Sequence, residues 1–133
     1  MAWSVLVVDD EPMTRTLLQL MLAPADYEVT EAGDGLEALA KVEQENPDII
    51  ILDIMMPNMD GLSVCRTLRQ NETTAAMPVI LLSAKTTPDA IQEGFFAGAN
   101  RYLTKPVSRK DLLVSLAELL PATAVPVSAG TAA

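Results

Sequence analysis

Five short apolar runs alternate with segments of helical periodicity along this chain, and this alternation constrains its fold more than any other feature. The run at residues 49–52, Ile-Ile-Ile-Leu, contains no polar residue and is typical of a strand buried on both faces. Strands that alternate strictly with helices form a parallel sheet with right-handed crossovers and helices on both faces. The sequence therefore predicts a doubly wound α/β fold with strands at residues 5–8, 27–32, 49–52, 78–82 and 101–103.

The segments between these strands carry the signals of helices. Pro12 suits the first turn of a helix, and Ser108 with Asp111 has the spacing of a capping box. Apolar residues recur at helical spacing within the segments, and these stripes include Leu17 in the first segment and Phe95 in the fourth. We expect five helices, at residues 12–23, 34–46, 61–68, 88–98 and 108–120.

The length and composition fit one domain. The chain has 133 residues, of which half are hydrophobic, and this is enough material for a core. The single cysteine cannot form an internal disulfide, which fits a reducing compartment. The N-terminus lacks the basic region of a signal peptide, and no apolar run approaches the ~20 residues of a membrane span. We expect a cytoplasmic domain at residues 3–120, with no membrane contact, followed by a disordered tail or the start of a linker at residues 121–133.

The charge balance excludes several classes of function. Nine Lys and Arg residues stand against eighteen Asp and Glu, a net charge of −9, so we expect no direct binding to nucleic acid. The chain contains no histidine, which excludes histidine-based catalytic triads and zinc sites with histidine ligands. Any histidine chemistry therefore requires a histidine from another molecule.

Polar residues follow four of the predicted strands. In sheets of this type, ligands bind beyond the carboxyl ends of the strands. A carboxylate at the end of a buried strand needs a compensating charge. Lysine supplies one such charge, and Mg²⁺, which prefers carboxylate and carbonyl oxygens, is the expected second. The strand exits are Asp9-Asp10-Glu11, Asp53, Ser83 and Thr104-Lys105-Pro106.

Each of these exits has an ordinary structural explanation when it is taken alone. Acidic residues before a helix stabilise its N-terminus through the helix dipole, and proline after a strand is a common stop signal. Ser83 alone indicates nothing. The joint occurrence of these residues, each at the exit of a buried strand in one alternating fold, is what favours a cation site.

Four motifs, VLVVDDE, DIIILDIMMPNMDG, VILLSAK and YLTKP, occur in the order and places found in one known family. The chain resembles the receiver domains of bacterial two-component response regulators, such as the single-domain chemotaxis regulator, over residues 3 to about 120. The resemblance implies a flavodoxin-like sheet with strand order 2-1-3-4-5. It also implies a regulatory phosphoacceptor, not an enzyme with a separate substrate, that promotes its own phosphorylation and dephosphorylation.

The resemblance further implies a role for each residue that would meet a phosphoryl group. Asp53 would accept this group from a histidine kinase or a histidine phosphotransfer protein. Lys105 would contact the phosphoryl oxygens, and its bond to Pro106 would be cis. Ser83 would form a hydrogen bond to the phosphoryl group, and Tyr102 would change rotamer with it.

A magnesium site is the second implication of the resemblance. Asp10 and Asp53 would bind Mg²⁺ through their carboxylates, Met55 through its backbone carbonyl, and Asp9 through water. As a separate hypothesis, the side chain of Met55 limits the access of water and so tunes the lifetime of the phosphoryl group.

The third implication is an output surface formed by the fourth helix, fifth strand and fifth helix, read by a downstream protein or an appended output domain. The winged-helix transcription factors of this family usually carry two acidic residues before the tyrosine of the fifth strand. Asn100 and Arg101 occupy these positions here. The ion pairs of the dimer formed by that subfamily would therefore be incomplete.

Three alternative functions fit the sequence less well. A phosphatase with an aspartyl nucleophile needs a general acid two residues after the nucleophile, where Met55 stands. A flavin or nucleotide module needs a phosphate-binding loop after the first strand, where DDEPMT places acid. A pseudo-receiver, which acts without phosphorylation, would normally lack an acidic residue of the pocket or the lysine, and both are present.

Overall fold

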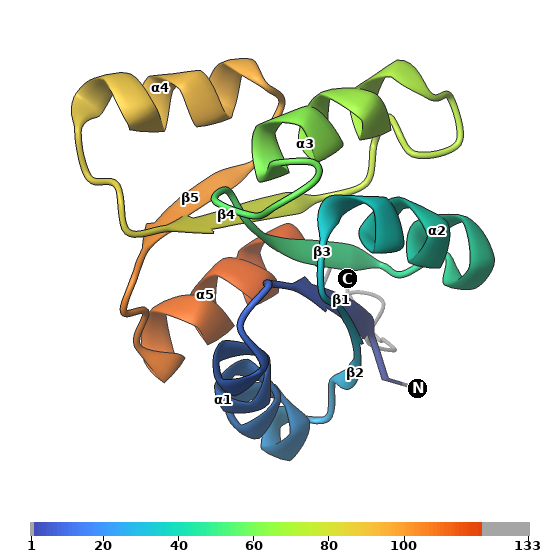
Figure 1. The fold of residues 1–133 in the computed structure, drawn as a ribbon. Helices are drawn as coiled ribbons and strands as arrows, with labels where there is room; N and C mark the ends of the chain where they lie inside the picture. Colours follow the sequence, from blue (N-terminus) through green and yellow to red (C-terminus); the bar gives the residue numbers. More distant parts are fainter. Residues whose placement is uncertain (1, 121–133) are drawn as a thin grey trace.

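The computed structural model describes residues 2–120, which form one five-stranded parallel sheet (Figure 1). The strand order is β2-β1-β3-β4-β5. This order and the alternation of strands with helices confirm the predicted doubly wound fold. The strands are β1 (Ser4–Val8), β2 (Glu28–Ala32), β3 (Ile49–Asp53), β4 (Val79–Ser83) and β5 (Arg101–Thr104).

Helices cover both faces of the sheet (Figure 1). One face packs against α1 and α5, and the other packs against α2, α3 and α4. A short 3-10 helix, η1 (Ala23–Ala25), follows the first helix. The five α-helices are α1 (Pro12–Leu22), α2 (Gly35–Glu45), α3 (Gly61–Gln70), α4 (Pro88–Phe96) and α5 (Arg109–Leu119).

The position of β3 in the middle of the sheet explains its run of four apolar residues. Successive side chains of a strand point to opposite faces, and both faces of this sheet are covered. Ile49 and Ile51 therefore enter the core against α1 and α5, while Ile50 and Leu52 enter the core against α2 and α3. All five residues of β3 are buried, including Asp53 at its end.

Polar side chains cap most of the helices. Asp34, Asp60, Thr87 and Ser108 each accept a hydrogen bond from the backbone N–H three residues later. This confirms the predicted helix start at Ser108. The helix α1 begins with Pro12 in its first turn, also as predicted.

Two of the predicted apolar stripes are wider than the helix faces that the sheet covers. The helix α1 buries Leu18 and Leu22, while Leu17 stays 52% exposed. In α4 the buried residue is Gly94, while Phe95 is 46% exposed. A side chain at position 94 would meet the ring of Tyr102 and a methyl group of Leu81, so the helix can approach the sheet only through a glycine.

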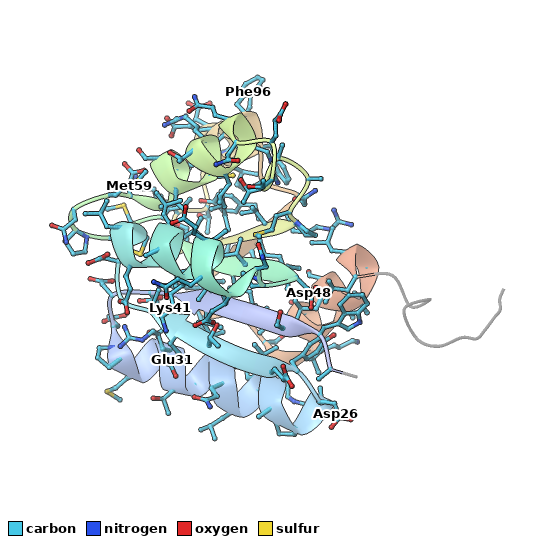
Figure 2. All side chains as sticks on the ribbon, turned by 90° about the vertical axis from the view of Figure 1, so that its right-hand side faces the viewer. Asp26, Glu31, Lys41, Asp48, Met59 and Phe96 are labelled. Carbon is cyan, nitrogen blue, oxygen red and sulfur yellow. The ribbon has the colours of Figure 1, made fainter. Side chains whose placement is uncertain are left out.

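Neighbouring Phe96 also points away from the body of the molecule (Figure 2). Within residues 2–120, no helix is long and apolar enough to span a bilayer. The predicted tail or linker at residues 121–133 lies outside the described residues.

Candidate functional site

The register of the sheet brings the strand exits to one edge. Val8 pairs with Leu52, so Asp9 and Asp53 follow at the same level. Ser83 ends the neighbouring strand β4 and pairs with Thr104 of β5. Each of these predicted site residues therefore lies at the carboxyl end of the sheet.

Three carboxylates gather at this edge. Asp9, Asp10 and Asp53 each place one carboxylate oxygen within 4.8 Å of the other two. Asp9 and Asp53 are 1% and 4% exposed, whereas Asp10 is exposed. At an effective dielectric constant of 20, two unit charges at this separation repel by about 3.5 kcal/mol. The cluster therefore requires positive charge.

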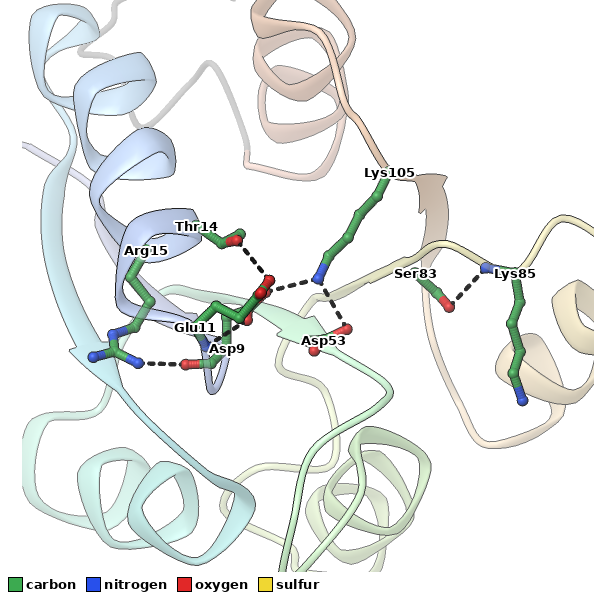
Figure 3. A network of polar contacts seen from close by, with 8 residues as sticks. All are labelled: Asp9, Glu11, Thr14, Arg15, Asp53, Ser83, Lys85 and Lys105. Carbon is green, nitrogen blue, oxygen red and sulfur yellow. Dashed lines mark hydrogen bonds and ion pairs between the residues drawn. The ribbon is translucent and has the colours of Figure 1, made fainter.

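Lys105 supplies part of that charge (Figure 3). Its Nζ lies 2.9 Å from Oδ2 of Asp9 and 3.3 Å from Oδ1 of Asp53. The backbone N–H of Lys105 donates to the carbonyl of Ser83 at 2.8 Å, which fixes the base of the side chain beside β4. The peptide bond from Lys105 to Pro106 is cis. One lysine against three carboxylates leaves an excess of two negative charges.

Burial and the neighbouring charges together shift the pKa values of the two central groups, Asp53 and Lys105. Burial and the charge of Asp9 raise the pKa of Asp53, although Lys105 and the backbone amide of Met55 act in the opposite direction. Burial by itself lowers the pKa of Lys105, but its hydrogen bond to Asp9 and the charge of Asp53 outweigh burial and leave that pKa raised. The lysine is therefore fully charged at neutral pH, and Asp53 remains incompletely compensated.

The turn after β1 is held by several hydrogen bonds. The Oδ1 atom of Asp9 accepts from the backbone N–H of Glu11 at 2.9 Å, and the N–H of Asp9 donates to the carbonyl of Ala32 at 3.2 Å. Arg15 donates from Nη1 to the carbonyl of Asp9 and from Nε to Glu31 Oε1, the latter at 2.9 Å (Figure 3 shows the first contact). Arg15 was not predicted as a site residue. Nothing in the spacing of the sequence marks it as one.

Ser83 and Tyr102 both contact the loop between β4 and α4. The Ser83 Oγ atom accepts from the backbone N–H of Lys85 at 3.1 Å, and the Tyr102 hydroxyl donates to the carbonyl of Lys85 at 3.0 Å. Figure 3 shows the Ser83 hydroxyl directed at Lys85. Among residues 2–120, Ser83 makes no hydrogen bond to the acidic cluster. The structure therefore brings the predicted hydroxyl to the rim of the cluster and not into it.

The loop after β3 approaches Asp53 closely. The backbone N–H of Gly61 donates to the carbonyl of Ile54 at 2.9 Å. A Cβ atom at position 61 would collide with the carbonyl oxygen of Asp53, so only glycine allows this approach. Met55 lies in the same loop and is 58% exposed.

Comparison with known proteins gives one consistent match. Residues 5–117 match the family model described as the response regulator receiver domain. The DNA-binding dual master transcriptional regulator RpaA from Synechocystis sp. is 40% identical over 119 residues, which cover 90% of this chain and 49% of that protein. The chain spans about half the length of the first curated relatives that it matches, 44% to 49% of each.

Solved structures of the same architecture align with nearly the whole chain. Chemotaxis protein CheY4 of Vibrio cholerae aligns with a TM-score of 0.85 and 37% identity, over 90% of this chain and 100% of CheY4. The receiver domain of sensor histidine kinase PA1611 from Pseudomonas aeruginosa aligns with a TM-score of 0.83 and 32% identity, over 90% and 98% of the two chains. The structure of that receiver domain is described with a magnesium ion coordinated in its active site cleft.

Proposed function

Because this chain belongs to the response regulator receiver domain family, we propose that Asp53 accepts a phosphoryl group from a phosphohistidine of a partner protein. The observation that carries this proposal is the cluster of three carboxylates with a single lysine at the strand ends. The absence of histidine from the chain agrees with a donor in another molecule. We assign this donor to a histidine kinase or a histidine phosphotransfer protein.

The acidic cluster fits a divalent cation. Three carboxylate oxygens within 4.8 Å of one another suit a hard ion, and the excess of two negative charges matches the charge of Mg²⁺. We assign direct binding to Asp10, Asp53 and the backbone carbonyl of Met55, and binding through water to Asp9. When bound, Mg²⁺ supplies charge that offsets the negative phosphoryl oxygens. The ion in the related receiver domain of PA1611 supports this assignment.

The residues at the strand ends account for the transfer. A carboxylate oxygen of Asp53 attacks phosphorus, the bond from phosphorus to the donor imidazole nitrogen breaks, and the imidazole leaves with the electron pair. Lys105, which now contacts both Asp9 and Asp53, reorients one N–H toward a phosphoryl oxygen. The Ser83 hydroxyl donates a hydrogen bond to another phosphoryl oxygen. Met55 cannot transfer a proton, which supports an acceptor over a phosphatase.

Signalling then follows from a local change of charge. A phosphoryl group on Asp53 adds negative charge and strong hydrogen-bond acceptors. As Ser83 turns toward this group, its bond to the N–H of Lys85 is lost, and Lys85 is also the residue that holds the hydroxyl of Tyr102. Tyr102 changes rotamer, and the surface of α4, β5 and α5 shifts between two states. A downstream protein or an appended output domain reads this surface. Because its net charge is −9, we expect the receiver domain itself to bind no nucleic acid.

Intact mass spectrometry after incubation with acetyl phosphate and Mg²⁺ tests the proposal. We expect one phosphoryl adduct on the native protein, and no adduct on Asp53→Asn or in the presence of a chelator. Asp26→Asn is the matched control, because Asp26 is exposed and lies before the amino end of β2, at the end of the sheet away from the site. This variant should retain the adduct. A folded protein that takes no phosphoryl group from acetyl phosphate or from a phosphohistidine donor would favour the pseudo-receiver alternative.

A further inference from the structure

We propose that Arg15 is a positioning residue for the cation site, because it fixes the backbone turn from which the carboxylate of Asp10 projects. This inference rests on the proposed Mg²⁺ site at Asp9, Asp10 and Asp53. It concerns the one guanidinium group that contacts the backbone of the acidic cluster within residues 2–120.

Arg15 joins three elements of the fold. It lies on α1, donates from Nη1 to the carbonyl of Asp9 at the end of β1, and donates from Nε to Glu31 on β2 at 2.9 Å. Its side chain is 18% exposed. The planar guanidinium holds its donors in a fixed fork, so two simultaneous bonds define its orientation. Lysine or glutamine cannot reproduce this geometry.

The contact falls where the regular hydrogen bonds of the sheet end. The N–H of Asp9 makes the last bond from β1 to β2, at 3.2 Å to the carbonyl of Ala32. Arg15 then donates to the carbonyl of Asp9, on the other side of the same residue. Glu11 and Lys105 hold its two carboxylate oxygens, each at 2.9 Å. Asp9 is therefore fixed through its backbone and its side chain.

The neighbouring Asp10 depends on this anchorage. Asp10 is exposed, and its carboxylate makes no hydrogen bond or ion pair within residues 2–120. The position of the Asp10 carboxylate relative to Asp9 and Asp53 therefore depends on the peptide group that links Asp9 to Asp10. Loss of the bond from Arg15 frees this peptide unit to rotate, and the three carboxylate oxygens no longer converge.

A positioning role and a purely electrostatic role of Arg15 predict opposite changes in Mg²⁺ affinity when the residue is replaced. Arg15 carries a positive charge close to a cation site, so its removal should strengthen Mg²⁺ binding if charge were all that mattered. Its partner Glu31 offsets most of that charge, which leaves the geometric effect dominant. We therefore expect weaker binding when Arg15 is replaced. A residue that supports a metal ligand typically contributes about 10-fold or more to metal affinity.

Isothermal titration with Mg²⁺ tests this inference on the native protein, Arg15→Gln and Arg109→Gln. Arg109 is the matched control, because its Nε also donates to a main-chain carbonyl, that of Met21 at 3.2 Å, and its replacement removes the same charge. We expect the dissociation constant to rise about 10-fold in Arg15→Gln and to stay within about twofold in Arg109→Gln. An unchanged or lower constant in Arg15→Gln overturns the inference.

A second variant keeps the test decisive if Arg15→Gln does not fold. Arg15→Lys retains the charge but cannot bond to Asp9 and Glu31 in the same fork, and we expect its dissociation constant to rise several-fold. An unchanged constant in this variant overturns the inference. If the native protein itself binds no Mg²⁺, the proposed cation site is wrong and the role of Arg15 falls with it. Equal binding by the native protein and the variants refutes the role of Arg15 alone.

Discussion

We expect Asp53→Asn to stabilise the metal-free protein, although it removes the proposed phosphoacceptor. Asp53 is buried and lies within reach of a second buried carboxylate, Asp9, and its pKa is raised by burial first and by that charge second. Asparagine has nearly the same shape and carries no charge. The substitution therefore removes an unfavourable charge without opening a cavity.

The magnitude follows from distances at the site. At an effective dielectric constant of 20, the repulsion between Asp53 and Asp9 across at most 4.8 Å is about 3.5 kcal/mol or more. The attraction to Lys105 across 3.3 Å is about 5 kcal/mol by the same formula. The attraction exceeds the repulsion by at most about 1.5 kcal/mol, and desolvation of a buried ion, which costs several kcal/mol, outweighs this difference. We expect the free energy of unfolding to rise by about 1–3 kcal/mol.

Urea unfolding in the presence of a chelator measures this change. For a slope of about 2 kcal/mol per molar urea, the midpoint of Asp53→Asn should rise by roughly 1 M. Asp26→Asn should change the free energy of unfolding by less than about 0.5 kcal/mol, because Asp26 is exposed and its positive φ suits asparagine. Added Mg²⁺ should reduce the difference in the free energy of unfolding between Asp53→Asn and the native protein, because only the native cluster binds the ion fully.

The opposite result would refute this reasoning. If Asp53→Asn in chelator were no more stable than the native protein, Lys105 would already compensate the cluster. The excess of two negative charges would then be no argument for a divalent cation.

Three further predictions follow from the same site and its surroundings. The pKa of Asp53 is raised in the folded state, so its charge destabilises the metal-free protein above that pKa. The gain in the free energy of unfolding from Asp53→Asn should therefore shrink as the pH falls toward 3.8, the ordinary pKa of the group. A gain that stays constant with pH in urea unfolding would contradict this. Gly61→Ala should lower the free energy of unfolding by about 2–3 kcal/mol through collision with backbone, while Gly33→Ala, which meets only side-chain ends at 3.4 and 3.5 Å, should cost far less. Gly94→Ala should displace the ring of Tyr102, which a Cβ would meet at 2.8 Å; the NMR signals of this ring should move, and unchanged signals would show that the ring has free space.

The fold could be predicted because its signals are local in the sequence. The run at residues 49–52 specifies a strand buried on both faces, and the structure buries all four residues in two cores. Strand exits meet at one edge whenever the sheet is parallel, so Asp9, Asp53 and Lys105 could be placed together before their distances were known. Their proposed roles in phosphoryl transfer remain predictions.

The remaining features depend on how far side chains reach and in which direction. Nothing in the spacing of the sequence indicates that Arg15 contacts the carbonyl of Asp9, or that the hydroxyl of Ser83 points to Lys85. Helical periodicity places Leu17 on an apolar stripe but does not give the width of the face that the sheet covers.

Asn100 illustrates the same limit of local patterns. The sequence marks it only as a departure from the acidic residue of a dimerising subfamily. In the structure its Oδ1 atom accepts from the N–H of Val79 at 2.8 Å and from Arg69 Nη2 at 2.9 Å. Its neighbour Arg101 lies 3.5 Å from Glu118 of the same chain. Both positions thus have partners within the domain.

The close packing around β3 has a mechanical consequence. All five residues of β3 are buried, and Gly61 lies directly against the carbonyl of Asp53, so this side of the site is stiff. Residues 84–87, between β4 and α4, are all exposed, so this side of the site is packed less tightly. If Asp53 accepts a phosphoryl group, we expect the larger displacement where the packing is looser, in the segment that carries Lys85. This contrast in packing predicts that the proposed response to phosphorylation runs away from the strand and toward α4.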